Sequence, residues 1–206
     1  MKNICFGTTS RWRQAFIKKM FGQLLPPSEF QLGEFYSSEF DETDLNSTPC
    51  RTIEDVQHLT KRISNEKLGS ILNSNTFSPD TFVVCFDQLV VKQTPEGIEV
   101  RPKPKDRETV RRYLESYSNS SLHVVNGWSV FDVENQLLTL HSSVDEIKFK
   151  EFDQAVFNHL LHHEHILTCA GGFISEEMKE YTIKPFEEIQ AACFGVPEQF
   201  FSFIKC

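Results

Sequence analysis

The sequence predicts a mixed α/β fold. Short apolar segments of strand-like composition alternate along the chain with segments that repeat apolar residues at helical spacing. Turn residues between some of the strand-like segments indicate antiparallel hairpins in the same fold. Apolar residues make up 39% of the 206 residues and charged residues 24%, which is typical of a chain that folds around a core. This length fits one domain over residues 1–206.

The first predicted elements are a strand and a helix joined by a hydroxyl-rich turn. The apolar run 3–6 ends at Gly7, and residues 8–10 all carry hydroxyl groups. Ser10 is suited to cap the helix, because its side chain can accept a hydrogen bond from a free backbone N–H group. Residues 38–49 are mostly polar and indicate a loop. Four apolar residues would share one face of the first helix: Phe16, Ile17, Met20 and Phe21.

In the middle of the chain, two predicted helices flank a predicted hairpin. Apolar residues recur at helical spacing over residues 52–72, and residues 106–117 show a second helical pattern. Residues 81–91 are apolar and rich in β-branched and aromatic side chains, which favours a strand. Residues 94–97 have turn chemistry, and residues 98–101 would form the return strand of the hairpin.

The last third of the chain predicts two further strands and two helices. Residues 122–133 and 136–149 have strand patterns, with a short polar turn between them. Residues 152–163 predict a helix, the glycines of residues 170–172 interrupt regular structure, and residues 197–204 predict a closing helix.

The charge of the chain limits the ligands that it can bind over a large surface. Its 21 basic and 29 acidic residues give a net charge of −8, which argues against a nucleic-acid polymer or an anionic membrane as partner. A small basic pocket for one anionic ligand remains compatible with this charge.

The chain has neither a run of about 18 apolar residues nor an export signal, so we expect a cytoplasmic protein. Six cysteines without a C-x-x-C pair then predict reduced thiols: Cys5, Cys50, Cys85, Cys169, Cys193 and Cys206.

Two polar segments in the first half of the chain are candidates for binding an anion or a metal. In residues 8–13, the N–H groups of a helix N-terminus, three hydroxyl groups and an arginine could hold an anion. The alternative is an ordinary helix cap with surface charge. Asp41 and Glu42 form an acidic pair, which is common on protein surfaces and uninformative by itself.

The strongest single candidate is the pair Asp87 and Gln88, which interrupts the apolar strand 81–91. An acid in such a strand should lie at its end, at a bulge, or at a site that uses the charge. A polar strand end or a solvent-facing residue is the alternative. Lys103 follows on a loop stiffened by two prolines, and the glycines of residues 168–176 could bring backbone close to a ligand or simply form a tight turn.

A histidine cluster near residue 160 does not match a known metal pattern. Spacings of three and four residues could place three imidazoles on one helix face, but no cysteine or acidic partner completes a zinc motif. A solvated helix end is therefore the preferred interpretation of these residues: His159, His162, His163 and His165.

Over residues 4–204, the ordered set of segments resembles the Maf (septum-formation-inhibitor) family of nucleoside triphosphate pyrophosphatases. The order of the segments is specific to that family, whereas no single segment is. In chain order they are a hydroxyl-rich turn with arginine (residues 8–13), an Asp-Glu pair (Asp41 and Glu42), a lysine on a helix (Lys67), an aspartate on an apolar strand (Asp87), a Lys-Pro pair (Lys103 and Pro104), an Ala-Gly-x-aromatic segment (residues 170–173) and a Gly-x-Pro (residues 195–197).

The resemblance implies a fold, a reaction and roles for these residues. The Maf/ITPase-like fold is an elongated mixed sheet flanked by helices, with a cleft between two lobes, and a homodimer is implied as well. The reaction is hydrolysis between the α- and β-phosphates with Mg²⁺ or Mn²⁺. By this resemblance, Asp87 would accept the proton of the attacking water and Glu42 would associate with the metal. The remaining residues would bind the phosphates: Ser10, Arg13, Lys67 and Lys103.

Within the family, the chain is more similar to the 7-methyl-GTP branch than to the dTTP/UTP branch. Trp12, Gln88 and Glu176 carry this similarity. The carboxylate of Glu176 can accept both donors of the guanine edge, and the face of Trp12 attracts the positive charge of an N7-methylated ring. The alternatives are a pyrimidine substrate and a non-catalytic nucleotide-binding regulator of cell division.

The first turn and the lysine loop depart from the family pattern. Arg11 stands where proline is usual, Gln14 stands where a further arginine is usual, and Pro102 stands where glycine usually precedes Lys-Pro. These departures bear on substrate choice more than on fold or reaction type.

Overall fold

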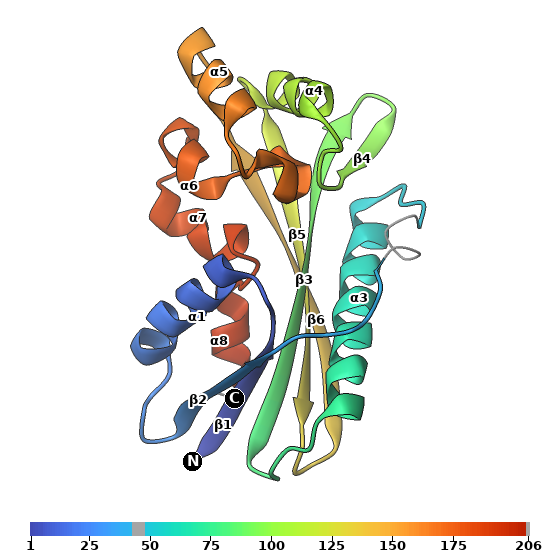
Figure 1. The fold of residues 1–206 in the computed structure, drawn as a ribbon, viewed down its shortest axis with the longest axis vertical. Helices are drawn as coiled ribbons and strands as arrows, with labels where there is room; N and C mark the ends of the chain where they lie inside the picture. The colour runs from blue at the N-terminus through green and yellow to red at the C-terminus, as the bar shows by residue number, and fades with distance from the viewer. Residues whose placement is uncertain (43–47, 205–206) are drawn as a thin grey trace.

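The computed structural model describes residues 1–42 and 48–204 and confirms the mixed α/β fold. The described residues form one six-stranded sheet in the order β2-β1-β3-β5-β6, with β4 paired to β3 (Figure 1). Parallel pairing joins β1 to β2 and β3, and antiparallel pairing joins the other neighbours. The strands are β1 (Lys2–Gly7), β2 (Phe30–Tyr36), β3 (Thr81–Thr94), β4 (Gly97–Arg101), β5 (Ser121–Asp132) and β6 (Leu137–Lys148).

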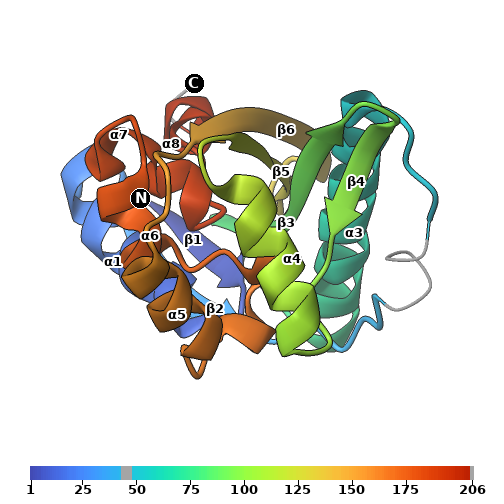
Figure 2. The ribbon, with the colours of Figure 1, turned by 90° about the horizontal axis from the view of Figure 1, so that it is seen from above.

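Helices cover both faces of the sheet. The long helix α3 lies along one face, while α1 and α8 lie on the other (Figure 1). Seen from above, the sheet runs between these two layers (Figure 2). The helices are α1 (Arg11–Leu24), α3 (Ile53–Ser74), α4 (Arg107–Tyr117), α5 (Gln154–His162), α6 (Ser175–Met178), α7 (Phe186–Cys193) and α8 (Glu198–Ile204), with 3₁₀ turns η1 (Ile166–Thr168), η2 (Ala170–Gly172) and η3 (Lys179–Tyr181).

Side-chain caps explain where several helices begin. Ser10 accepts a hydrogen bond from the backbone N–H of Arg13, as predicted. Thr52 and Asp55 form a reciprocal capping box at the start of α3. Asp106 and Asp153 cap α4 and α5 by accepting hydrogen bonds from the backbone N–H groups of Thr109 and Val156. Each cap satisfies backbone donors that the first helical turn leaves without partners.

Buried side chains form separate clusters toward the two ends of the long strands. One cluster joins β1, α1 and α8 to β3 and β5, and the rings of Phe6, Phe86 and Phe200 meet there with centroids 5.2–6.2 Å apart. We call this end the first lobe. The other cluster joins β3, β5 and β6 to α4, α5 and the segment that follows α5, and we call it the second lobe. Helix α7 contributes buried residues to both clusters, so it lies between the lobes.

The structure contains several elements that were not predicted from the sequence. Strand β2 and helices α6 and α7 are new, and β3 continues to Thr94 beyond the predicted end at residue 91. The predicted loop 38–49 includes residues 43–47, which lie outside the described residues, as does Cys206. The other five cysteines are unpaired.

Over the described residues, no helix has both the length and the apolar character needed to span a membrane.

Candidate functional site

A cavity of about 690 Å³ opens beside the middle of β3. One edge of β3 pairs with β5 along most of its length. On the other edge, β1 pairs with β3 as far as Cys85, and β4 begins to pair with β3 only at Val90. Within the described structure, residues 86–89 therefore have no strand neighbour on that edge. The cavity lies in this gap, which explains why polar residues interrupt an apolar strand there.

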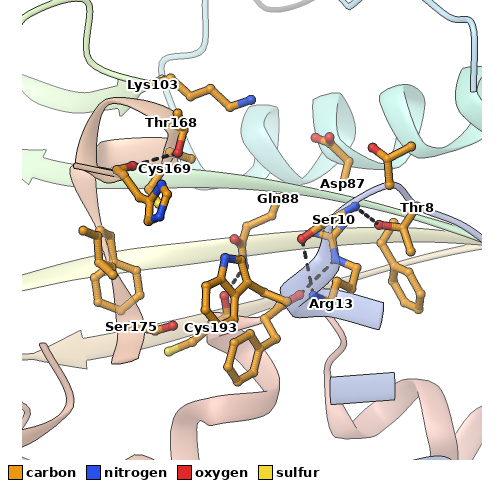
Figure 3. A pocket seen from close by; sticks show the side chains of 18 of the residues that line it. Thr8, Ser10, Arg13, Asp87, Gln88, Lys103, Thr168, Cys169, Ser175 and Cys193 are labelled. Carbon is orange, nitrogen blue, oxygen red and sulfur yellow. Dashed lines mark hydrogen bonds between the residues drawn. The ribbon is translucent and has the colours of Figure 1, made fainter. Parts of the chain in front are cut away.

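All nine residues predicted for the site line this cavity, although they come from six different parts of the chain. The first lobe contributes the turn before α1, and the second lobe contributes the loop after β4 and helix α6 (Figure 3). Their roles are predictions that the geometry alone does not test. The nine residues are Ser10, Trp12, Arg13, Glu42, Lys67, Asp87, Gln88, Lys103 and Glu176.

Lys67 lies between two carboxylates at the centre of the site. Its ammonium group is 2.8 Å from Oδ1 of Asp87 and 2.7 Å from Oε1 of Glu42. Burial acts to lower the pKa of Lys67, but the two carboxylates outweigh it and the pKa lies above its usual value. The lysine is therefore held as a cation, and it brings Glu42 from its loop to Asp87 on β3.

The second oxygen of Asp87 is available for a ligand. Asp87 is 6% exposed, and its Oδ2 atom is buried without a hydrogen-bond partner among the described residues. A buried carboxylate oxygen without a partner is energetically costly, so it marks a place where a water, a metal or a substrate atom can bind. A second carboxylate, that of Glu42, shares the Lys67 ammonium with Asp87.

The turn before α1 exposes backbone donors to the cavity. Ser10 N–H donates to Thr8 Oγ1 at 3.3 Å, and the Gln14 side chain donates to the Thr8 carbonyl at 2.8 Å. These bonds fix the turn at the N-terminus of a 14-residue helix, where N–H groups and the helix dipole favour an anion. Gln14, which stands where the family usually has arginine, thus stabilises the turn through its bond to the Thr8 carbonyl.

Arg13 is held in place by residues that follow α7. Its Nε atom donates to the carbonyl of Phe194 at 2.9 Å, and its guanidinium lies 5.8 Å from the ring centre of Phe86. Gly195 has φ of 68°, and a Cβ atom there would lie 2.5 Å from Nη2 of Arg13. Burial lowers the pKa of Arg13, while Asp87 acts in the opposite direction. Only glycine at position 195 leaves room for this arginine.

Gln88 connects β3 to the C-terminal end of α7. Its Nε2 atom lies 2.8 Å from the carbonyl of Ala192, 3.2 Å from that of Cys193 and 3.0 Å from Oδ1 of Asn126. Asn126 Nδ2 also donates to the Ala192 carbonyl, at 3.3 Å. The sequence analysis missed Asn126, although it interrupts the apolar strand β5 much as Gln88 interrupts β3.

The wall from the second lobe carries Lys103, Ser175 and Glu176. Lys103 is exposed, and no hydrogen bond or ion pair of its ammonium is seen in the described part of the chain. Its loop is tied down by a bond of 3.1 Å from Gly171 N–H to the carbonyl of Pro102. Ser175 Oγ donates to a carboxylate oxygen of Glu176 at 3.0 Å. Trp12, at the opposite wall, is 62% exposed, so its ring is accessible.

His159, His162 and His165 are exposed around the end of α5, as predicted for a solvated helix end. Two of the four clustered histidines also line the cavity, which was not predicted. His163 and His165 follow α5 and lie in the cavity wall with Glu177. Glu177 is 2.9 Å from His159 and 3.8 Å from His163. The helical spacing had suggested one face for these histidines, but α5 ends at His162, so the last two lie in the following turn.

The cysteines in the cavity wall are not suited to act as nucleophiles. Cys169 and Cys193 line the cavity, and burial raises the pKa of both thiols. A raised pKa keeps them protonated at neutral pH, whereas the thiolate is the reactive form.

Three comparisons place this chain among known proteins. A family model described as Maf-like protein matches residues 3–201. A 7-methyl-GTP pyrophosphatase from Dictyostelium discoideum is 24% identical over 200 residues, covering 95% of this chain and 91% of that protein. A dTTP/UTP pyrophosphatase from Ruminiclostridium cellulolyticum is 23% identical over 201 residues, covering 96% and 91%. A solved HAM1 protein from Coxiella burnetii aligns over 100% of this chain and 99% of its own, at 13% identity and a TM-score of 0.45.

Proposed function

This chain belongs to the Maf-like protein family, and from that premise we propose that it is a nucleoside triphosphate pyrophosphatase. The reaction is hydrolysis of the bond between the α- and β-phosphates, which yields a nucleoside monophosphate and pyrophosphate. The observation that carries the proposal is the convergence of Arg13, Lys67, Lys103 and the buried carboxylate of Asp87 on one cavity between two lobes. Both relatives described above are named as pyrophosphatases.

The phosphates would bind where the cations and the N-terminus of α1 meet. The turn before α1 lines the cavity, so the first-turn N–H groups and the dipole of this helix would favour an anion there. Arg13 and Lys103 line the same cavity from opposite lobes. Arginine can bind two phosphate oxygens at once, whereas lysine acts as a point charge. A triphosphate would therefore bridge the lobes.

Asp87 would accept the proton of the attacking water. Its Oδ1 atom is held by Lys67 at 2.8 Å, which fixes the orientation of the carboxylate. Its Oδ2 atom has no hydrogen-bond partner among the described residues, so it can accept a hydrogen bond from a water placed beside the α-phosphate.

The charge of the cavity favours a divalent cation that arrives with the substrate. The described lining residues include four carboxylates and three side chains of lysine or arginine. These three positive side chains are therefore too few to balance both the carboxylates and the nearly four negative charges of a triphosphate. Asp87 and Glu42 would hold Mg²⁺ or Mn²⁺, which commonly use one or two carboxylates and complete their ligands with phosphates and water. When bound, the ion would neutralise charge on the phosphate oxygens. The described residues contain no group of three protein ligands that could hold a metal by themselves, which agrees with an ion shared with substrate.

N7-methyl-GTP is the substrate that the base side of the cavity favours. Trp12 is accessible, and an aromatic face attracts a cationic ring by about 0.5–2 kcal/mol. Glu176 lines the same cavity and is an acceptor for the two donors of the guanine edge. The alternative substrates are dTTP and UTP.

The test is release of pyrophosphate from N7-methyl-GTP, GTP, dTTP and UTP, measured with Mg²⁺, with Mn²⁺ and with EDTA. We expect pyrophosphate rather than orthophosphate, loss of activity in EDTA, and the highest kcat/KM for N7-methyl-GTP. A higher kcat/KM for UTP or dTTP would favour the pyrimidine alternative. Binding without turnover of any triphosphate would contradict the enzyme and favour a nucleotide-binding regulator.

A further inference from the structure

Asn126 is a buried polar residue beside the cavity that the mechanism above does not use. It lies on β5, directly opposite Gln88 in the ladder between β3 and β5, and it is 0% exposed. Directly paired residues project to the same face of a sheet, so their side-chain amides meet. Both amides also reach the last carbonyls of α7.

The surroundings decide which way the amide of Gln88 points. The carbonyls of Ala192 and Cys193 can only accept hydrogen bonds, so the amide group that faces them must be the nitrogen of Gln88. Asn126 donates to the Ala192 carbonyl with its nitrogen, and this turns its own oxygen toward Gln88 Nε2, 3.0 Å away. The NH₂ group of Gln88, which has two hydrogens to donate, is thus surrounded by three acceptors: the two carbonyls and the Asn126 oxygen.

The carbonyl oxygen of Gln88 is then the polar atom left for a ligand. Gln88 lines the cavity, and no hydrogen bond to its Oε1 atom is seen among residues 1–42 and 48–204. Glu176 supplies further acceptor oxygens in the same cavity, with one of them fixed by Ser175. The base would therefore meet acceptors from both residues.

We propose that Asn126 is a positioning residue that acts together with the last carbonyls of α7. As one of the three acceptors around the Gln88 nitrogen, it holds the Gln88 oxygen toward the cavity and so selects bases that present hydrogen-bond donors. The inference rests on the proposed function and concerns its base specificity. Guanine presents a ring N–H and an exocyclic amine at one edge, which two acceptors can bind. Uracil and thymine present acceptor, donor and acceptor, so two facing acceptors repel them. Asn126 touches neither base nor phosphate in this arrangement.

The experiment compares kcat/KM for GTP and UTP in the wild type and in Asn126→Leu, which keeps the branched arrangement of heavy atoms but removes the amide oxygen and nitrogen. We expect the GTP-to-UTP ratio to fall about fivefold, the effect of one hydrogen bond. The fall should come mainly from KM, because the phosphate site is intact. In a Gln88→Leu background, Asn126→Leu should leave the ratio unchanged, since Asn126 acts through Gln88. Asn126→Ser provides a smaller change if the leucine variant does not fold.

Ser129→Ala is the matched control. Ser129 lies on the same strand, is 0% exposed, and donates to the carbonyl of Ser64 at 2.9 Å, away from Gln88. It should lower stability without changing the ratio. An unchanged ratio in the Asn126 variants, or an equal loss on both nucleotides, would overturn the inference. Preference of the wild type for UTP would overturn it while leaving the proposed reaction intact, and failure to hydrolyse any triphosphate would overturn both.

Discussion

The two carboxylate oxygens of Asp87 lie in different surroundings, and this difference defines its chemistry. Oδ1 forms a 2.8 Å ion pair with Lys67, whereas Oδ2 is buried without a partner in the described structure. An aspartate kept only for stability would have both oxygens bonded, because each unsatisfied buried acceptor costs about 1–3 kcal/mol. The free oxygen therefore supports the proposed role of Asp87 as a base.

Replacing Asp87 by asparagine should lower kcat by about a hundredfold or more, because the amide keeps the shape but cannot accept a proton. Pyrophosphate release at saturating substrate measures this. Glu99→Gln is the control, since Glu99 also pairs with a buried cation, Arg101 at 2.8 Å, but does not line the cavity. Nearly full activity of Asp87→Asn would remove Asp87 from the role of base.

A candidate site residue could be predicted from the sequence where a polar or charged side chain interrupts an apolar segment. Asp87 and Gln88 stand out in an apolar strand, and the structure places both at the cavity. Asn126 interrupts β5 in the same manner, yet its importance depends on lying opposite Gln88, which no single segment reveals. His163 likewise enters the wall only because the chain folds back after α5.

At the scale of elements, the site exists because two strands share one edge of β3. Strand β1 leaves this edge at Cys85 and β4 joins it at Val90, so the intervening residues face a cavity and not a neighbour. The hairpin of β3 and β4 could be predicted from the turn residues 94–97. The long helix α3 could be predicted from the helical spacing of its apolar residues. The parallel pairing of β1 with β3 joins segments about 75 residues apart and leaves no local signal.

The elements that the sequence did not predict depend on contacts made by the folded chain. In the described part of the chain, strand β2 lies at the edge of the sheet and pairs with β1 alone, in parallel. Its residues do not alternate regularly between buried and exposed, so the pattern typical of a strand is weak. Helices α6 and α7 have four and eight residues, too few to be stable without packing. Ile189 and Cys193 of α7 are buried in the core of the second lobe, which supplies that packing.

Gly195→Ala should raise the KM for the triphosphate about tenfold, because the new methyl group would displace the guanidinium of Arg13. Positive φ adds a cost of about 1 kcal/mol in stability. Steady-state kinetics and urea unfolding measure the two effects. Gly97→Ala also places a Cβ at a positive φ, here 134°, but with open space around it, so it should lower stability and leave KM unchanged. Equal KM values in both variants would show that Arg13 does not bind substrate.

At the scale of the whole molecule, the ligand has to overcome an unfavourable overall charge. The chain carries a net charge of −8, so a triphosphate is repelled until it reaches the local cations. These cations lie on both lobes, with Arg13 on the first and Lys103 on the second, and α7 packs between them. A bound triphosphate should therefore join the lobes and stabilise the molecule as a unit.

A non-hydrolysable triphosphate with a methylene group between its α- and β-phosphates should raise the Tm with Mg²⁺ present. At a hundred times its Kd, the analogue stabilises by about 2.7 kcal/mol, or about 5–10 °C for a chain of this length. Arg13→Gln and Lys103→Gln should each weaken binding about tenfold, which halves the shift at the same concentration. Lys105→Gln removes an exposed lysine of the same loop that does not line the cavity, so its shift should equal that of the wild type. If Lys103→Gln also keeps the full shift, the triphosphate is bound by the first lobe alone.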